Sequence, residues 1–419
     1  MKIQNLTCVL IFALYASLAE AKSLSVSSED LVCALEEAVA KGPPGISAAI
    51  ATRDGVIWSG VAGHTDLQNR VSTKYSHLFG IGSITKTFVA IVTLQLIEEG
   101  KLKLTDTAKG ILGDQVSGVP NADIANISQL LNHTSGIPSF EDDPVWIREG
   151  RGEALDVAHV WGKRESLAYV TGENHKPLFP PGENFSYSNT NYTLLGLMIE
   201  EVTGNDVVME IDTRIRKPIG ISSIYLEGFE PVPQERLSRR YHYSTVGFES
   251  VAGINAAFAP VTDKLVDASA SNLSSEWTDG GMVATAGDLA KFAVAVRDGR
   301  LLSAENQKHL MDWRLVLEGK YPMWVGHGLF RETRFPGIMI GHSGSVLGYT
   351  GYMGWHEDVD VIVTVLTNAG SMHVGERVMT ASGLAQSKKF SRLAIAYATQ
   401  GVDGPDRGII VTIEDLCSE

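Results

Sequence analysis

Residues 83–99 constrain the fold of this chain more than any other segment. They predict a helix whose apolar residues point in all directions, namely Ile84, Phe88, Val89, Ile91, Val92, Leu94, Leu96 and Ile97. Gly100 follows as a typical helix-terminating residue. Because a helix that is apolar all round is stable only when other elements enclose it, we expect this helix in the interior of the molecule.

The same helix begins with Gly82-Ser83-Ile84-Thr85-Lys86, a Ser-x-x-Lys pattern. Positions i and i+3 share one helix face, so the Lys86 amine can reach the Ser83 hydroxyl. Burial among apolar residues would lower the pKa of the lysine toward that of a useful base. The spacing therefore indicates a nucleophile and its base. The alternative, common in helices by chance, is a capping serine beside a solvated lysine.

Residues 1–21 resemble a cleavable signal peptide. Lys2 supplies a positive start, residues 9–19 an apolar core, and Ala19-Glu20-Ala21 a small-x-small cleavage site. The apolar run is too short to span a bilayer comfortably, and an uncleaved anchor is the alternative. We therefore expect a secreted or periplasmic protein.

Composition narrows the class of protein further. A length of 419 residues predicts two packed regions, and the net charge of −14 argues against nucleic acid or an anionic membrane as partner. The eleven histidines are scattered, and no Cys and His residues have the spacing of metal ligands. In an oxidising compartment Cys33 and Cys417 could form a disulfide or stay free thiols.

Strand patterns lie at both ends of the chain and helical patterns in its middle. Helices are expected at 28–40, 127–131, 154–168, 191–202, 205–217, 288–298 and 375–398, and strands at 46–52, 56–62, 337–341, 349–355 and 359–366. This order predicts an α+β fold, with an antiparallel sheet flanked by terminal helices and an inserted, mostly helical domain. We assign 22–80 and 281–398 to the α/β domain, 81–280 to the helical domain and 399–419 to a tail.

A second group of polar residues, Tyr187-Ser188-Asn189, lies just before the helix predicted at 191. Beside a lysine ammonium a tyrosine phenolate is favoured, so Tyr187 could carry a proton between a serine and a leaving group. Asn189 could donate to a substrate carbonyl. A half-buried tyrosine and a helix-capping asparagine are the structural alternatives.

The third group is Gly341-His342-Ser343-Gly344-Ser345, at the end of a predicted strand. Glycines at this position let another backbone approach, so an extended substrate could add along the strand. The amide of Ser345 could form an oxyanion hole with the amide of Ser83. A glycine-rich turn with a surface histidine is the alternative.

In this order, Ser-x-x-Lys, Tyr-x-Asn and His-x-Gly resemble the serine penicillin-recognising hydrolases, the group of class C β-lactamases and D-alanyl-D-alanine carboxypeptidases (peptidase family S12). Further similar stretches are 130–137, 187–192 and Gly280-Gly281-Met282 leading into Asp288-Leu289, so the resemblance covers about residues 28–398. The family fold joins an α/β domain with an antiparallel sheet to a mostly helical domain, with the nucleophile at their junction.

The resemblance also implies roles for the residues of the three motifs. Ser83 would form an acyl-enzyme, and Lys86 and Tyr187 would share the base and proton-relay work. Asn189 would hold the amide of the substrate, and the strand of His342 would dock its backbone. Neither a metal nor an organic cofactor is needed by this mechanism.

The chain departs from dedicated β-lactamases of the family at the third motif, where Lys-Thr-Gly is usual and His342-Ser343-Gly344 stands here. Histidine is largely neutral at pH 7. The pattern is similar to the His-x-Gly variant of D-alanyl-D-alanine carboxypeptidases, D-aminopeptidases and D-amino-acid amidases. A substrate carboxylate would then need another cation. Arg331 and Arg334 are candidates, with ordinary surface charges on a hairpin as the alternative.

The sequence thus predicts an exported serine hydrolase that acts on small peptides or amides, as a D-alanyl-D-alanine carboxypeptidase or a D-amino-acid peptidase or amidase. A carboxylesterase, a weak class C-like β-lactamase and a non-catalytic binding homologue are the alternatives. β-Lactams are expected to be able to acylate it, and neither nucleic acid nor a metal is expected as a partner. Phe140, Trp146 and Trp277 are candidates to line subsites.

Overall fold

The structure is a computed structural model that describes residues 26–172, 175–316, 322–334 and 337–400. The predicted signal peptide, Cys417 and the tail beyond Gln400 lie outside these ranges, so export and the Cys33–Cys417 disulfide remain predictions. Cys33 itself is exposed. Within the ranges described, no helix is both long and apolar enough to cross a bilayer.

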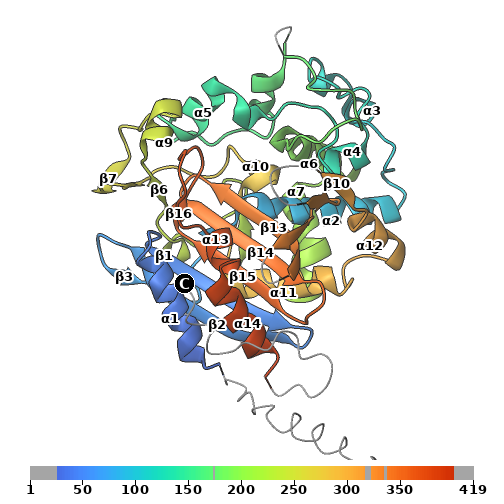
Figure 1. Cartoon of the computed structure of the whole chain (residues 1–419). Coiled ribbons are helices and arrows are strands. Elements are labelled where there is room, and N and C mark those ends of the chain that lie inside the picture. Colours follow the sequence, from blue (N-terminus) through green and yellow to red (C-terminus); the bar gives the residue numbers. More distant parts are fainter. Residues whose placement is uncertain (1–25, 173–174, 317–321, 335–336, 401–419) are drawn as a thin grey trace, which may run out of the picture.

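A nine-stranded antiparallel sheet forms one side of the molecule (Figure 1), with the strand order β10-β11-β12-β13-β14-β15-β1-β2-β3. Its strands are β1 (Gly45–Thr52), β2 (Gly55–Asp66), β3 (Val71–Ser72), β10 (Arg314–Val316), β11 (Met323–Val325), β12 (Phe330–Arg334), β13 (Gly337–Val346), β14 (Tyr349–His356) and β15 (Ile362–Thr367). Because β1 pairs with both β2 and β15, the two ends of the chain meet inside one sheet.

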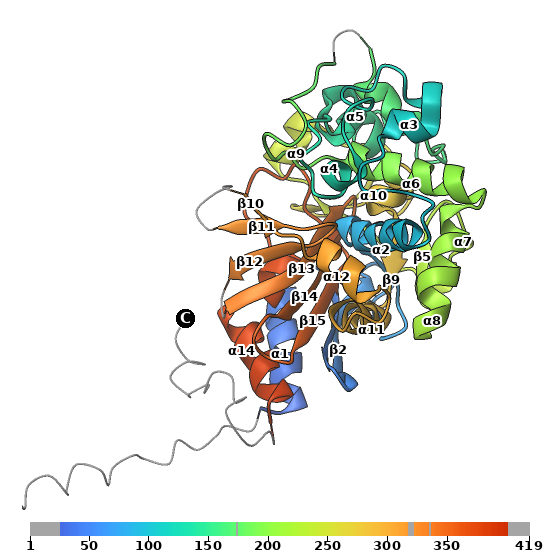
Figure 2. The ribbon, with the colours of Figure 1, turned by 90° about the vertical axis from the view of Figure 1, so that its right-hand side faces the viewer.

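Helices cover both faces of this sheet (Figure 2). The terminal helices α1 (Ser28–Val39), α13 (Ala381–Ala385) and α14 (Lys388–Ala398) pack on one face, and α2 (Thr85–Glu98) and α11 (Ala286–Arg297) lie on the other. Strand β1 is buried throughout since its alternate side chains enter two cores: Ile46 and Ile50 face the terminal helices, and Ala49 faces the core around α2.

The other side of the molecule is mostly helical, and two small sheets border it (Figure 1). Its helices are α3 (Ala108–Leu112), α4 (Ile127–Leu131), α5 (Pro144–Arg151), α6 (Asn189–Thr203), α7 (Val207–Ile211), α8 (Lys217–Ile219), α9 (Val246–Val251), α10 (Trp277–Gly280) and α12 (Ala304–Leu310). The small sheets combine β4 (Phe79–Gly80), β9 (Met282–Ala284) and β5 (Ile224–Leu226), and β16 (Ala369–Gly370), β6 (Tyr241–Tyr243), β8 (Leu265–Asp267) and β7 (Ala259–Thr262). The predicted α+β fold class is confirmed.

The helix expected in the interior is α2. Every residue from Thr85 to Leu94 is buried, and Phe88 stacks on Phe292 of α11 with ring centroids 3.6 Å apart. The helix starts two residues later than expected because Ser83 lies in a preceding 3₁₀ turn, Gly82–Ile84. The apolar pattern therefore predicted burial correctly and misjudged only the first turn.

Two helix predictions are wrong. Residues 154–168 form turns that lead into a short 3₁₀ helix, Glu165–Val170. Side chains compete there for the backbone: the carboxylate of Asp156 accepts from the amide of Ala158, and the amide of Trp161 donates to Ser274. Residues 375–398 contain the two helices α13 and α14 instead of one, because Ser387 caps a new helix start.

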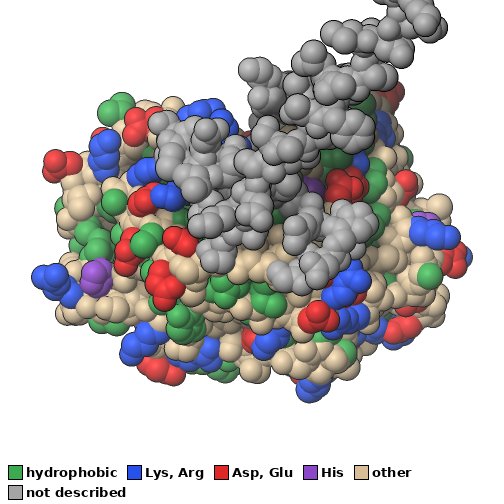
Figure 3. Space-filling model, turned by 60° about the horizontal axis from the view of Figure 1, so that its bottom comes forward, with side chains coloured by type: hydrophobic (Ala, Val, Ile, Leu, Met, Phe, Trp, Pro, Cys, Tyr) green, Lys and Arg blue, Asp and Glu red, His purple; other side chains and the backbone are tan. Residues whose placement is uncertain are grey.

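The molecular surface carries charges of both signs. On the face seen in Figure 3, Lys and Arg side chains alternate with Asp and Glu, so this face has no continuous basic patch among the residues drawn in colour. This distribution gives a polyanion such as nucleic acid no extended basic surface to bind on that face.

Candidate active site

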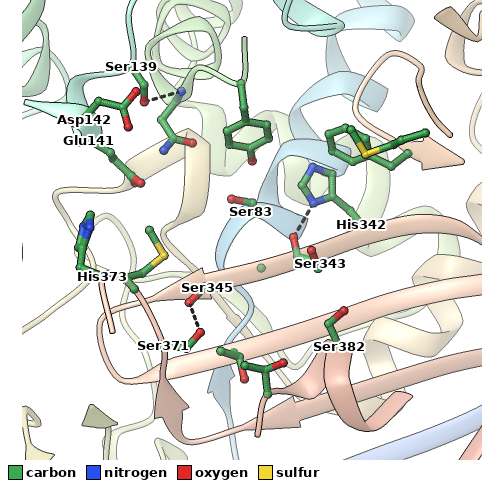
Figure 4. Close-up of a pocket in the computed structure, with 18 of the residues that line it drawn as sticks. Ser83, Ser139, Glu141, Asp142, His342, Ser343, Ser345, Ser371, His373 and Ser382 are labelled. Carbon is green, nitrogen blue, oxygen red and sulfur yellow. Dashed lines mark hydrogen bonds between the residues drawn. The ribbon is translucent and has the colours of Figure 1, made fainter. Parts of the chain in front are cut away.

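Ser83 projects into a cavity where the helical side of the molecule meets the large sheet (Figure 4). It follows Gly82, whose φ of +54° places it in the left-handed region that favours glycine. A Cβ atom on Gly82 would lie only 2.6 Å from the main-chain nitrogen of Ser345 on β13. Glycine at this position therefore lets the turn that carries Ser83 contact the strand.

Lys86 is fully buried directly behind Ser83. Its Nζ lies 3.2 Å from Ser83 Oγ and donates to Asn189 Oδ1 at 2.5 Å and to the carbonyl oxygen of Asp279 at 2.6 Å. These two oxygens can only accept, so each takes one hydrogen of the Lys86 amine. The remaining side of the nitrogen then faces Ser83. Burial lowers the pKa of Lys86, which favours the neutral amine that can accept the proton of Ser83.

Tyr187 lies beside this pair as a neutral phenol. Lys86 Nζ is 4.9 Å from the centroid of its ring, and its hydroxyl is buried near Ser83. Burial raises the pKa of Tyr187 well above its usual range, although the neighbouring Ser83 side chain acts in the opposite direction. The expected phenolate is therefore wrong for the resting protein, because desolvation outweighs the nearby lysine. A neutral phenol can instead donate a proton to a leaving group.

His133 positions Tyr187, and sequence reasoning did not single it out. Its ring stacks on Tyr187 with centroids 4.2 Å apart, and its Nδ1 accepts from the amide of Ser188 at 3.1 Å. His133 is buried at the end of α4 with a φ of +58°. It belongs to Asn132-His133-Thr134-Ser135-Gly136, part of the stretch 130–137 that resembles the family, and this resemblance was the signal available in the sequence.

His342 is also neutral. Its Nδ1 donates to the carbonyl oxygen of Ser343 at 2.5 Å, so its Nε2 carries the lone pair. That Nε2 is buried without a partner. Burial, together with the charge of Lys86, lowers the pKa of His342 to about 3. His342 therefore offers the site a hydrogen-bond acceptor and no positive charge at neutral pH.

Asn189, at the start of α6, faces both the base and the cavity. Its side-chain oxygen accepts from Lys86, and its main-chain amide donates to Ser139 Oγ at 3.2 Å. Since the oxygen is used by Lys86, the NH₂ group is left to donate to a substrate carbonyl. Asn189 thus links the position of the base to the position of the substrate.

Gly344 sets the distance between β13 and the nucleophile. A Cβ atom there would overlap the carbonyl oxygen of Ile81 and lie 2.8 Å from the main-chain nitrogen of Ser83. This close approach brings the backbone of Ser345 beside that of Ser83. Two main-chain amides so placed are the usual components of an oxyanion hole.

The cavity has a volume of about 680 Å³ and an acidic lining. Ser83, Tyr187, Asn189 and 342–345 all line it, and so do Glu141, Asp142 and Glu332, which the sequence analysis had not named. In the part of the chain that the structure describes, no lysine or arginine lines it. Figure 4 shows Glu141 and Asp142 on one side of Ser83, and His342 on the other.

The predicted carboxylate-binding role of Arg331 is wrong. Strand alternation turns Arg331 to the face of β12 away from the cavity, where it forms a bidentate pair with Glu357 at 2.7 and 2.8 Å. Arg334 is on the same face as Glu332 and lines a small neighbouring cavity. The predicted subsite residues Phe140, Trp146 and Trp277 are core residues that do not line the main cavity. Phe185 and Phe330 line it instead, together with Tyr187.

A buried charge network supports the acidic side of the cavity. The Arg151 guanidinium contacts Glu141 Oε1 at 2.6 Å and Glu276 Oε1 at 2.9 Å, and it is fully buried. Carboxyl oxygens of Glu141, Glu276 and Asp279 lie within 4.8 Å of one another, a spacing that could hold a metal ion, but Arg151 already supplies a positive charge there. Burial raises the pKa of Glu276 and of Asp279 well above the usual range.

Comparison with known proteins agrees with this geometry. A family model described as Beta-lactamase matches residues 32–387. The chain belongs to the β-lactamase family. As a member of that family, it belongs with the serine β-lactamases and penicillin-binding proteins.

Two relatives illustrate the range of the family. Penicillin-binding protein 4 of Amycolatopsis lactamdurans is 28% identical over 316 residues, which cover 72% of this chain and 74% of that protein. Protein flp of Staphylococcus aureus (strain NCTC 8325 / PS 47) is 32% identical over 199 residues, or 46% of this chain. This match spans only 37% of the length of flp.

Solved structures of the superfamily share the fold. A D-stereospecific amidohydrolase from Streptomyces sp. is 28% identical, with a TM-score of 0.71, and the match covers 90% of this chain and 100% of that one. D-amino acid amidase from Ochrobactrum anthropi SV3, in complex with L-phenylalanine amide, is 23% identical with a TM-score of 0.73, and the match covers 89% and 97% of the two chains. At that identity the second match supports the fold alone.

Proposed function

We propose that this protein hydrolyses amide bonds of D-amino-acid compounds through an acyl-enzyme. Ser83 Oγ attacks the carbonyl carbon and gives its proton to the neutral amine of Lys86. The amides of Ser83 and Ser345 stabilise the oxyanion. Tyr187 donates a proton to the departing nitrogen and regains one from the ammonium of Lys86. Water then hydrolyses the acyl ester, which releases the acid and restores the Ser83 hydroxyl.

The charge of the cavity supports a substrate that carries a free ammonium group. Glu141 and Asp142 form one side of the cavity next to Asn189, and among the described lining residues there is no cationic side chain to oppose them. Burial raises the pKa of Glu141, but Arg151 and the contacts to Glu276 and Lys86 outweigh it, so this carboxyl stays ionised at neutral pH. An α-ammonium group on the acyl part of the substrate therefore finds a favourable potential there.

The similarity to a D-stereospecific amidohydrolase points in the same direction. We therefore favour D-amino-acid amides, or peptides with an N-terminal D-residue, as substrates. The experiment compares kcat/KM for D-phenylalanine amide, its L-enantiomer and N-acetyl-D-phenylalanine amide. The proposal predicts at least tenfold preference for the first over each of the others. Equal rates for the free and acetylated amides would contradict recognition of the ammonium group.

D-Alanyl-D-alanine carboxypeptidase activity is the second candidate, and Arg334 is the observation that favours it. This guanidinium lines a small cavity that shares His342 and Ser343 with the main one. A cation in that place could hold the carboxylate of a C-terminal residue. Covalent labelling by a fluorescent penicillin tests the related proposal that β-lactams acylate Ser83.

We also propose that the protein is exported, on the basis of the signal-peptide pattern in residues 1–21. Expression in a secreting host, followed by mass spectrometry of the extracellular protein, tests this. A mature N-terminus near Lys22 is expected, and retention of the full chain inside the cell would contradict it.

A further inference from the structure

A second, smaller cavity continues from the main one along β12 and β13. Its volume is about 110 Å³, and it shares Phe330, Glu332, His342, Ser343 and Ser382 with the main cavity. Arg334, Met339, Gly341, Tyr352 and Gln386 complete its lining. The two cavities are therefore parts of one surface, joined at His342 and Ser343.

The position of the small cavity relative to Tyr187 identifies the part of the substrate that would enter it. A leaving group must contact the residue that protonates it. Phe330 and His342, which the two cavities share, have ring centroids 6.3 Å from that of Tyr187. The acidic residues Glu141 and Asp142 line only the main cavity. The leaving group therefore lies toward the small cavity, and the acyl group toward Glu141 and Asp142.

The small cavity contains one ion pair. Glu332 and Arg334 lie on the same face of β12, since side chains two residues apart along a strand share a face. Arg334 Nε donates to Glu332 Oε2 at 3.2 Å, and their side chains are 41% and 24% exposed, respectively. Glu332 is the member of this pair that also lines the main cavity.

We propose that Glu332 is a specificity-determining residue that excludes leaving groups with a free carboxylate. This inference rests on the proposed amide hydrolysis and assigns its leaving-group class. Glu332 acts in two ways: it occupies the guanidinium of Arg334, and its own charge repels a second carboxylate at the entrance. Neutral His342 supplies no compensating cation. The leaving group is therefore uncharged, as in ammonia from a primary amide or a peptide segment whose carboxylate is blocked.

The test measures a ratio of two kcat/KM values, that for D-alanyl-D-alanine divided by that for D-alanine amide. In Glu332→Gln the repulsion is removed and Arg334 is released, so we expect this ratio to rise about tenfold. The double variant Glu332→Gln/Arg334→Gln should lose most of that gain, because the released cation is gone. Arg331→Gln is the matched control, since this arginine lies on the opposite face of the same strand and pairs with Glu357.

The outcomes separate this inference from the proposed function. If the wild-type protein hydrolyses neither compound nor any other D-amide, the proposed function fails. If it hydrolyses D-alanine amide and the ratio is unchanged or lower in Glu332→Gln, the specificity role fails, and Glu332 instead orients Arg334 to bind a carboxylate. A gain that persists in the double variant would likewise contradict release of Arg334. Circular dichroism of each variant checks that it is folded.

Discussion

The side-chain oxygen of Asn189 lies 2.5 Å from the amine of Lys86, across 103 residues of sequence. Asn189 begins α6 and Lys86 lies in the first turn of α2, so the packing of these two buried helices fixes the base. An amide oxygen accepts a hydrogen bond without adding a full negative charge. This choice of partner keeps Lys86 close to Ser83 without adding a charge that would oppose the lowering of its pKa by burial.

The first prediction concerns the charge at position 189. In Asn189→Asp a carboxylate beside Lys86 favours the ammonium form and raises the pKa of Lys86. In the pH profile of kcat/KM for D-phenylalanine amide, the acid limb should move to higher pH by at least one unit. At pH 7, kcat/KM should fall at least tenfold. Asn189→Ala is the control, because it removes the acceptor without adding charge and should not move the limb upward. An unchanged limb in Asn189→Asp would mean that Lys86 is not the base.

The second prediction assigns the chemical steps to three residues. Ser83→Ala should abolish both hydrolysis and the acyl adduct seen by intact-mass spectrometry, because the nucleophile is gone. Lys86→Ala and Tyr187→Phe should each slow acylation by roughly 10²–10⁴, the range for general acid–base groups. Turnover retained in Ser83→Ala would overturn the mechanism, and a loss below about tenfold in either other variant would remove that residue from proton transfer.

The third prediction follows from buried neutral histidines. Burial lowers the pKa of His242 and His342 to about 3, and that of His327 to about 4. Between these values and about 6.5 the unfolded chain binds protons that the folded chain does not, so the free energy of unfolding falls as the pH falls. Each group contributes roughly 1.4 kcal/mol per pH unit once the pH is well below 6.5.

Urea denaturation at several pH values between 7 and 5 measures this slope. His327→Gln removes one titrating group. The slope of the free energy of unfolding against pH should therefore fall by the contribution of one proton, roughly 1.4 kcal/mol per pH unit. A slope that is the same in this variant would show that His327 is protonated in the folded protein.

Much of this architecture could be predicted from local patterns. Helix α2 was recognisable because apolar residues surround it, and strands β1 and β2 because their apolar runs fall in the ranges expected, 46–52 and 56–62. The three motifs could be named because their residue types carry chemistry and because their order resembles a known family. These signals depend only on neighbouring residues or on resemblance to a family, so they can be read from the sequence alone.

The charge of the site could not be predicted in the same way. Glu141 and Glu332 come from segments almost 200 residues apart, and only the fold brings both to one cavity. Arg331 and Arg334 look equivalent in the sequence, but strand alternation sends them to opposite faces of β12. The protonation state of Tyr187 depends on the depth of its burial, which local sequence does not reveal.

The fourth prediction concerns stability and uses two arginines of helix α5. Arg151 is fully buried between Glu141 and Glu276, whereas the side chain of Arg148 is 52% exposed and pairs with Glu153 at 3.0 Å. Removing one partner of a buried ion pair leaves an uncompensated charge, so Arg151→Met should lower the free energy of unfolding by about 3–5 kcal/mol.

Arg148→Met should change the free energy of unfolding by at most about 1 kcal/mol, because an exposed pair contributes little. Urea denaturation of the two variants, which make the same substitution one helical turn apart, measures the difference. In Arg151→Met the unpaired Glu141 should also take up a proton more readily, since its main stabilising charge is lost. Equal losses in the two variants would show that Arg151 does not hold the acidic side of the cavity together.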